Sequence, residues 1–188
     1  MASPLEIIVG HLKNGDIVGF PTDTVYGCGV SVKDAEGARV VNDFKHRDSN
    51  QPVQWLIANK SDIDFYAKDV PDYARELMDE NWPGGYSFIF KASENVPENF
   101  LCGLDTIAFR MPKCACARKV ITALGCPIAA SSANFTGDEP PQFKDDVAPE
   151  FMDALPYALT CLHGQCHDAT GIPSTIIDCT GDEPKTIR

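Results

Sequence analysis

The residues best suited to chemistry are polar side chains that directly follow short apolar runs. The first group is Pro-Thr-Asp-Thr-Val-Tyr-Gly at 21–27, which follows the apolar run at 17–20 and holds two hydroxyls, a carboxylate and a phenol. Ligands of open α/β sheets bind at strand ends, so this segment is a candidate binding loop. Thr and Asp side chains also bond to the backbone in ordinary turns. A structural turn is therefore the open alternative.

A basic pair, Lys45 and Arg47, ends a predicted helix over 34–44. Cations are favourable at a helix C-terminus in any case, so an exposed surface pair is one interpretation. Residues at i and i+2 do not share a helix face, so the two side chains would splay as the helix unwinds. In an acidic chain this pair is the best candidate for an anion pocket, where both cations could reach one polyphosphate.

The predicted strand over 106–112 carries an arginine among small residues. Strand alternation places Thr106, Ala108 and Arg110 on one face. The planar guanidinium suits a carboxylate held by two hydrogen bonds. Asp105 is adjacent in sequence and points to the opposite face, so we expect a ligand carboxylate, rather than Asp105, to pair with Arg110. An unidentified internal carboxylate is the alternative.

Two further hydroxyl-rich segments lie at predicted strand ends. The small residues of 129–133 run into Asn-Phe-Thr-Gly at 134–137, where Ser132 and Asn134 would point the same way if strand geometry persists. A common Asn/Gly turn is the alternative. Ser174 is the first residue of an apolar strand predicted over 174–179. These hydroxyls and the amide are candidates for orienting a ligand.

The cysteines predict free thiols rather than a disulfide framework. The eight cysteines are scattered, several of them within apolar runs, as expected of small buried side chains in a reducing compartment. One segment, 161–167, offers four zinc-ligand types: Cys161, His163, Cys166 and His167. Structural zinc sites usually divide their ligands into two separated pairs. We therefore expect no metal site here, only a loop that carries Cys and His.

Apolar periodicity predicts alternating helices and strands, which indicates an α/β fold with a mixed, twisted sheet. The chain of 188 residues is of ordinary length for one domain, so we expect residues 1–188 to form a single unit. The predicted helices cover 4–13, 34–44, a stretch from 61, 71–81, 115–124 and 142–155, the last broken at Pro149. The predicted strands cover 16–21, 54–58, 86–91, 106–112, 127–132, a short stretch at 159 and 174–179.

Composition limits the classes of partner. Hydrophobic residues make up 44% of the chain and charged residues 23%, which excludes wholesale disorder. The net charge of −11 opposes approach to a polyanion, so a phosphate site must be a local basic pocket. No apolar run approaches the roughly 20 residues of a membrane span, and the first residues lack a secretory signal pattern. We expect a cytoplasmic protein with no membrane partner.

Six of these segments, in this order, resemble the YrdC-like family of threonylcarbamoyl-AMP synthases. The resemblance implies a single α/β domain with a twisted sheet around a concave basic cleft, and no additional C-terminal domain. It implies that L-threonine, bicarbonate and ATP with Mg²⁺ become threonylcarbamoyl-AMP and pyrophosphate, for threonylcarbamoyl-adenosine modification of tRNA. A separate transferase complex would act downstream. The matching segments are 21–27, 45–47, 82–84, 110–112, 132–137 and 173–178.

The resemblance also implies a role for each matching residue. Lys45 and Arg47 would hold the ATP phosphates and serve catalysis. The threonine contacts would be Thr24, Arg110 and Ser174, and the other nucleotide contacts Thr106, Ser132, Asn134 and Arg188. No protein ligand for a metal is implied, and no residue stands out as a general base. His46, beside the basic pair, is a candidate, and a bound phosphate oxygen or water is the alternative.

Three departures from the family pattern bear on ATP affinity rather than on the fold. Asp48 stands where proline is common, Gly85 replaces the second proline of a Pro-Gly-Pro turn, and Pro140 belongs to an acidic Gly-Asp-Glu-Pro-Pro segment. The alternative function is a paralogue that binds nucleotide or double-stranded RNA without synthase activity. The presence of both the Lys-x-Arg and the Ser-x-Asn pairs favours the synthase.

Overall fold

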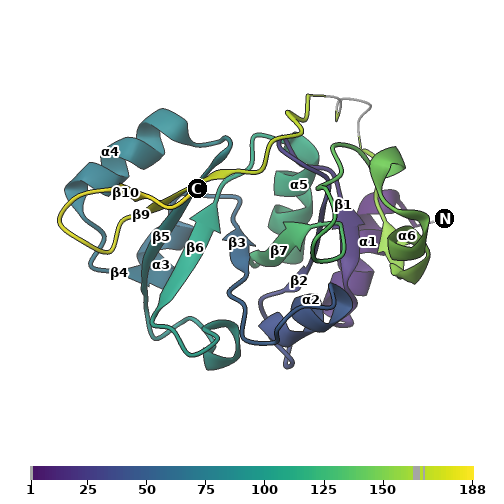
Figure 1. Ribbon diagram of the computed structural model, residues 1–188, viewed down its shortest axis with the longest axis horizontal. Helices are drawn as coiled ribbons and strands as arrows, with labels where there is room; N and C mark the ends of the chain where they lie inside the picture. Colours follow the sequence, from purple (N-terminus) through teal and green to yellow (C-terminus); the bar gives the residue numbers. More distant parts are fainter. Residues whose placement is uncertain (1, 163–165, 167) are drawn as a thin grey trace.

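A mixed β-sheet spans the width of the molecule, with α4 at one end and α1 and α6 at the other (Figure 1). The computed structural model describes residues 2–162, 166 and 168–188. Within them ten strands form one sheet in the order β10-β9-β5-β6-β3-β7-β2-β1-β8, with β4 paired to β5. The strands are β1 (Val18–Phe20), β2 (Gly27–Ser31), β3 (Gln54–Leu56), β4 (Ala67–Lys68), β5 (Tyr86–Ala92), β6 (Thr106–Arg110), β7 (Ile128–Ser132), β8 (Tyr157–Ala158), β9 (Thr175–Asp178) and β10 (Lys185–Thr186). The predicted α/β class with a mixed sheet is confirmed.

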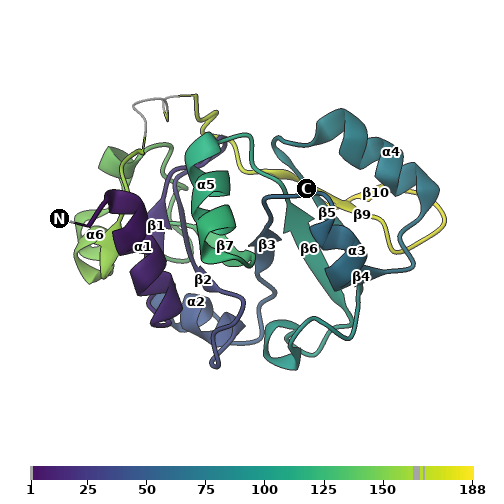
Figure 2. The same ribbon diagram turned by 180° about the vertical axis from the view of Figure 1, so that it is seen from behind.

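The helices pack around this sheet, and α1 and α5 lie side by side in front of it when the molecule is seen from behind (Figure 2). Ser3 and Glu6 form a capping box that starts α1, whose apolar stripe is buried. Gly125, in the left-handed conformation at φ 77°, ends α5. The helices are α1 (Pro4–Lys13), α2 (Ala38–Phe44), α3 (Asp62–Tyr66), α4 (Asp72–Asn81), α5 (Ala115–Leu124) and α6 (Pro149–Ala154), with 3₁₀ turns η1 (Glu98–Phe100) and η2 (Lys144–Asp146).

Strand register brings the predicted polar segments to the middle of the sheet. β3 pairs in parallel with β6, so Leu56 lies opposite Arg110. β2 pairs antiparallel with β7, so Gly27 at the end of the 21–27 loop lies opposite Ser132. β9 pairs in parallel with β5, which places Thr175, and therefore Ser174 before it, beside the start of β5. The sheet thus gathers side chains from distant parts of the sequence around one place.

Two sequence-based element predictions were wrong in extent. The helix expected over 142–155 contains only η2 and the short α6, because Pro149 begins α6 instead of breaking a longer helix. The helix expected from residue 34 begins at Ala38. Strand β2 was not anticipated. Its glycines weaken the apolar alternation, yet the fold requires Gly29, since a Cβ there would collide with the Ala129 carbonyl oxygen and lie 2.8 Å from Ile128 Cγ2.

The core fills the space between sheet and helices. Trp55 on β3 is completely buried and makes edge-to-face contacts with Tyr66, Phe100 and Phe109. Such aromatic pairs bury much apolar area in a fixed geometry, so they hold β3 rigidly in the sheet centre. No helix within the described residues has the length and apolar character needed to cross a membrane.

Candidate functional site

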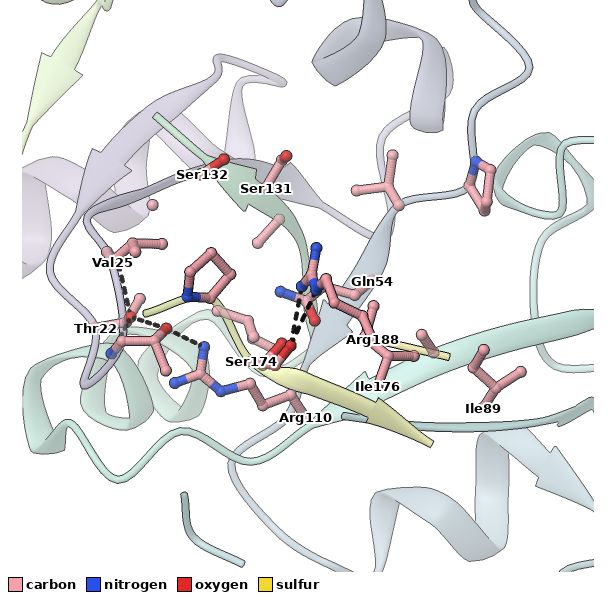
Figure 3. Close-up of a pocket in the computed structure, with 18 of the residues that line it drawn as sticks. Thr22, Val25, Gln54, Ile89, Arg110, Ser131, Ser132, Ser174, Ile176 and Arg188 are labelled. Carbon is pink, nitrogen blue, oxygen red and sulfur yellow. Dashed lines mark hydrogen bonds between the residues drawn. The ribbon is translucent and has the colours of Figure 1, made fainter. Parts of the chain in front are cut away.

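A cavity of about 390 Å³ opens over the central strands, where the predicted polar segments meet (Figure 3). Its walls come from the 21–27 loop, from β3, β6 and β7, and from the segment before β9. The charged side chains among its described lining residues are Arg47, Arg110 and Arg188, with no carboxylate. In a chain of net charge −11, this concentration of arginine indicates an anionic ligand. The basic character of the wider cleft stays a prediction.

Arg110 lies at the buried end of this cavity and is 2% exposed. Its Nε donates to Gly84 O at 3.0 Å, Nη1 to Thr24 Oγ1 at 2.7 Å and Nη2 to Asp23 Oδ1 at 2.7 Å. Burial lowers the pKa of the guanidinium and the Asp23 carboxylate partly restores it. The alternative of an internal carboxylate is confirmed in Asp23, and the ligand carboxylate as a further partner of Arg110 stays a prediction. Each terminal nitrogen still carries a second N–H beyond these described bonds.

Asp23 was not predicted as the partner of Arg110. Its Oδ1 also accepts from the backbone N–H of Lys113 at 2.9 Å and of Cys114 at 3.4 Å, just before α5. The carboxylate therefore ties the 21–27 loop to both β6 and α5. The only sequence signal was its place between Thr22 and Thr24, because 87 residues separate it from Arg110.

The 21–27 loop is both a hydrogen-bonded turn and a cavity wall. Thr22 Oγ1 donates to Val25 O at 2.7 Å and accepts from Thr24 N at 3.1 Å, which fixes the loop. Thr22 and Thr24 line the cavity (Figure 3). Tyr26 does not take part, because its hydroxyl donates to Leu159 O at 2.7 Å inside the core. Burial raises the pKa of this phenol, so it stays protonated.

A chain of hydroxyls and an amide supports the opposite wall. Ser87 Oγ donates to Gln54 Oε1 at 2.8 Å, so Ser174 Oγ donates to Ser87 Oγ at 2.9 Å. The Arg188 guanidinium donates to Ser174 O from Nε at 3.2 Å and from Nη2 at 3.0 Å (Figure 3). Ser174 and Arg188 were predicted site residues. Gln54 was missed, because nothing in a short buried strand distinguished its side chain.

The basic pair divides into two roles. Lys45 is buried and donates to the backbone oxygens of Ser132 and Asn134, and it is not among the cavity-lining residues. Arg47 lines the cavity, and its Nη2 donates to Pro52 O at 3.4 Å. The intervening His46, at φ 54°, turns the two side chains apart as expected. The interpretation as an exposed surface pair is wrong for Lys45, whose pKa burial lowers.

Of the remaining candidates for nucleotide contacts, two line the cavity and one does not. Thr106 and Ser132 line the cavity, as do Ala108 and Arg110. β6 is a continuous strand from Thr106 to Arg110, so strand alternation places its residues 106, 108 and 110 on one face, as predicted. Asn134 lies outside the lining, and its amide donates to Phe135 O at 3.0 Å and Asp138 O at 2.8 Å. β7 ends at Ser132, so the strand geometry that would align the two side chains does not persist.

The departures from the family pattern affect the cavity unequally. Asp48 is exposed and accepts from Asn50 N at 2.8 Å, so its carboxylate closes a turn rather than entering the cavity. Gly85 O accepts from Thr175 N at 2.9 Å, which joins β5 to β9. Pro140 lines the cavity directly. Two other predicted candidates, His163 and His167, lie outside the described residues.

Comparisons with known proteins agree over nearly the whole chain. The family model for Sua5, YciO and YrdC proteins, described as telomere recombination, matches residues 10–188. Threonylcarbamoyl-AMP synthases of Pyrococcus abyssi and Bacillus subtilis are 34% and 31% identical over 98% and 94% of this chain. The chain spans about half the length of these two relatives, 53% and 50%. Uncharacterized protein YciO of Escherichia coli is 27% identical over 94% of this chain and 84% of its own.

Solved structures agree on the fold. A crystal structure of Pyrococcus abyssi Sua5 complexed with L-threonine superposes with a TM-score of 0.90 at 33% identity, covering 98% of this chain and 53% of that one. Escherichia coli YciO superposes at 0.82 with 23% identity, covering 98% of this chain and 87% of that one. The match over 10–188 and these superpositions show that this chain belongs to the YrdC/Sua5 family.

Proposed function

We propose that this protein is a threonylcarbamoyl-AMP synthase that acts on L-threonine, bicarbonate and MgATP. The observation that carries the proposal is the cavity, which has a buried arginine at one end and two more arginines elsewhere in its lining. Threonine supplies one carboxylate and ATP supplies the phosphates for such a pocket. The related synthases at 34% and 31% identity and the threonine complex of Pyrococcus abyssi Sua5 support it.

Threonine would bind at the Arg110 end. The second N–H groups on the two terminal nitrogens of Arg110 form the fork that suits a carboxylate. Thr24 and Ser174 would place hydroxyls beside the bound amino acid. Asp23 stays paired with Arg110 and balances its charge when threonine is absent. This arrangement makes the guanidinium preorganised, because three bonds to the chain already fix its plane.

ATP would bind toward Arg47 and Arg188, with Thr106 and Ser132 as neutral contacts. Lys45 would act as a positioning residue, since its ammonium donates hydrogen bonds to the backbone oxygens of Ser132 and Asn134. Mg²⁺ would arrive on the phosphates as part of the substrate. The described lining residues provide hydroxyls but no carboxylate, which fits an ion that keeps water and phosphate ligands.

The reaction needs positioning and charge neutralisation more than covalent participation by the protein. The neutral amine of threonine attacks the carbon of bicarbonate and water leaves, or it adds to the CO₂ formed by dehydration of bicarbonate and loses a proton to solvent; either route gives a carbamate. A carbamate oxygen then attacks the α-phosphorus and pyrophosphate leaves with the electron pair of the broken P–O bond. Arginines aimed at the phosphates stabilise the developing charge. His46 stacks on Phe135 at 4.7 Å and is not among the described lining residues, so we assign it no role as a base.

The deciding experiment measures pyrophosphate release from ATP and bicarbonate with a panel of amino acids. We expect release to require both L-threonine and bicarbonate. Serine should substitute weakly, because the loss of one methyl costs roughly 1 kcal/mol or somewhat more in a fitted pocket. Equal release with glycine, or without an amino acid, would exclude threonine as the substrate. The last part of the test supplies the product to a downstream transferase complex and measures whether the threonylcarbamoyl group is transferred to tRNA.

A second candidate, a YciO-like paralogue that binds a nucleotide or duplex RNA, is favoured by one observation. This chain is 27% identical to uncharacterized protein YciO of Escherichia coli over 94% of the chain. The same assay separates the two, because the paralogue would bind nucleotide yet release no pyrophosphate with any amino acid in the panel.

A further inference from the structure

Four cysteine sulfurs meet where the start of α5 approaches the segment after β8. Cys116 Sγ lies 2.9 Å from Cys166 Sγ and 3.7 Å from Cys161 Sγ. Cys161 Sγ and Cys166 Sγ are 3.0 Å apart. The sulfurs of Cys114, Cys116 and Cys166 all lie within 4.8 Å of one another. Two pairs separated by more than forty residues, Cys-x-Cys and Cys-x₄-Cys, therefore form one cluster.

We propose that this cluster binds one structural zinc ion through four thiolates: Cys114, Cys116, Cys161 and Cys166. Division of the ligands into two separated pairs is typical of structural zinc sites. A tetrahedral ion with Zn–S bonds of about 2.3 Å needs sulfurs about 3.8 Å apart. The 3.7 Å between Cys116 Sγ and Cys161 Sγ matches this spacing, and Cys166 Sγ, which lies 2.9 and 3.0 Å from its two neighbours, would move outward on binding. In the sequence only the four candidate ligands within 161–167 were considered, and because they are not divided into two separated pairs, no metal site was expected.

The close contacts favour a central cation over a single disulfide. Cys166 Sγ approaches two sulfurs almost equally, at 2.9 and 3.0 Å, whereas a disulfide needs only one partner. One bridge would also leave two thiols crowded against it. A single cation can be bound by all four sulfurs at once, so none of them is left unbound beside a bridge.

The residues around the cysteine cluster supply hydrogen bonds to its sulfurs, and a neighbouring cavity gives an ion access to it. Leu162 N donates to Cys116 Sγ at 3.2 Å, an N–H···S contact of the kind that orients metal ligands. Cys114 Sγ lies 3.4 Å from Pro21 O, and Cys114 N donates to Asp23, so the ion would lie beside the 21–27 loop. A second cavity of about 380 Å³, lined in part by Cys161 and Cys166, gives the ion access.

Metal analysis and cobalt substitution of the full chain test the proposal. Protein prepared under reducing conditions with zinc should hold about one ion per chain, as a mononuclear site does. Replacement by Co²⁺ should give strong thiolate-to-cobalt charge-transfer absorption and the visible bands of tetrahedral cobalt. Cys116→Ser and Cys166→Ser should lose the stoichiometric zinc. Cys102→Ser, a partly exposed thiol outside the cluster, should keep it.

A melting temperature that falls on chelation and returns with zinc would also support a structural ion, and this readout does not depend on synthase activity. The cobalt spectrum of the unmutated chain keeps the test decisive if a serine variant fails to fold. Wild-type protein without bound zinc and without cobalt charge-transfer bands would overturn the proposal. So would a stable disulfide within the cluster in protein that retains no metal.

Discussion

Arg110 combines ligand binding and structural support in one side chain. It links β6 to Gly84 and to the 21–27 loop through three hydrogen bonds, of which the one to Asp23 is also an ion pair, and it lines the cavity. A buried ion pair is costly to break, because the remaining charge loses its partner. Substitution of Arg110 therefore tests stability and binding together, and the two effects must be measured on the same sample.

We expect Arg110→Lys to weaken threonine binding by about tenfold or more, because an ammonium keeps the charge and loses the fork. ATP affinity should stay unchanged. The melting temperature should fall, since one nitrogen cannot reach Gly84, Thr24 and Asp23 together. Calorimetric titration and thermal melting check these outcomes. The matched control is Arg75→Lys, because Arg75 is an exposed arginine of α4 that pairs with Asp64 of α3. A folded Arg110→Lys protein with wild-type threonine affinity contradicts the carboxylate role.

The basic pair should separate into a structural and a binding residue. Arg47→Ala should weaken ATP binding by about ten- to hundredfold, since a charge-assisted contact is worth about 1.5–3 kcal/mol. Its melting temperature should fall less than that of Lys45→Ala, because the buried side-chain acceptor that loses its arginine donor, Asn42 Oδ1, is neutral. Lys45→Ala should destabilise the fold by about 1–3 kcal/mol, because it removes the ammonium that donates to the carbonyl oxygens of Ser132 and Asn134. The Cys28 thiol, 3.7 Å from Ser132 O, is a weak substitute. Denaturant unfolding and ATP titration of both variants give the comparison, and equal effects on both measurements would contradict the division.

At the scale of elements, contact between β2 and β7 is what brings the 21–27 loop beside Ser132. The two strands approach so closely that Gly29 has no room for a side chain. Gly10, in the interior of α1, has no atom within 4 Å of a Cβ position. Substitution by alanine is therefore expected to change the melting temperature in opposite directions at these two positions.

Gly29→Ala should lower the melting temperature by about 2–12 °C, because overpacking costs about 1–3 kcal/mol and each kcal/mol corresponds to about 2–4 °C at this length. Gly10→Ala should raise it by about 1–4 °C, since alanine in a helix is more stable than glycine by about 0.5–1 kcal/mol. Thermal melting of both variants checks the pair. A neutral Gly29→Ala would show that β2 and β7 adjust easily.

For the whole molecule, the distribution of charge favours a small anionic ligand over nucleic acid. The net charge of −11 repels nucleic acid, while the arginines of the cavity attract a small anion. We expect duplex RNA to bind weakly at low salt and not measurably at physiological salt, because counterion release from few phosphate contacts gives little affinity. Gel-shift titration across salt concentrations measures this. Tight binding with a steep salt dependence would favour the RNA-binding alternative.

The sequence by itself determined most elements and the types of residue at the cavity. Periodicity identified α1, α4, α5 and the central strands, because their apolar spacing is local to each segment. Strand alternation placed Thr106, Ala108 and Arg110 on one face, as the structure has them. Their proposed roles remain predictions that came from the family resemblance.

Only the tertiary structure decided which distant groups meet. The partnership of Asp23 with Arg110, the backbone contacts of Lys45 and the meeting of Cys116 with Cys166 each join segments 50 or more residues apart. Local spacing carries no information about such contacts, because they depend on strand order and register. From each segment alone, no internal partner could be named for Arg110, for Lys45 or for the cysteines of 161–167. Their partners Asp23, Ser132 and Cys116 come from distant parts of the chain.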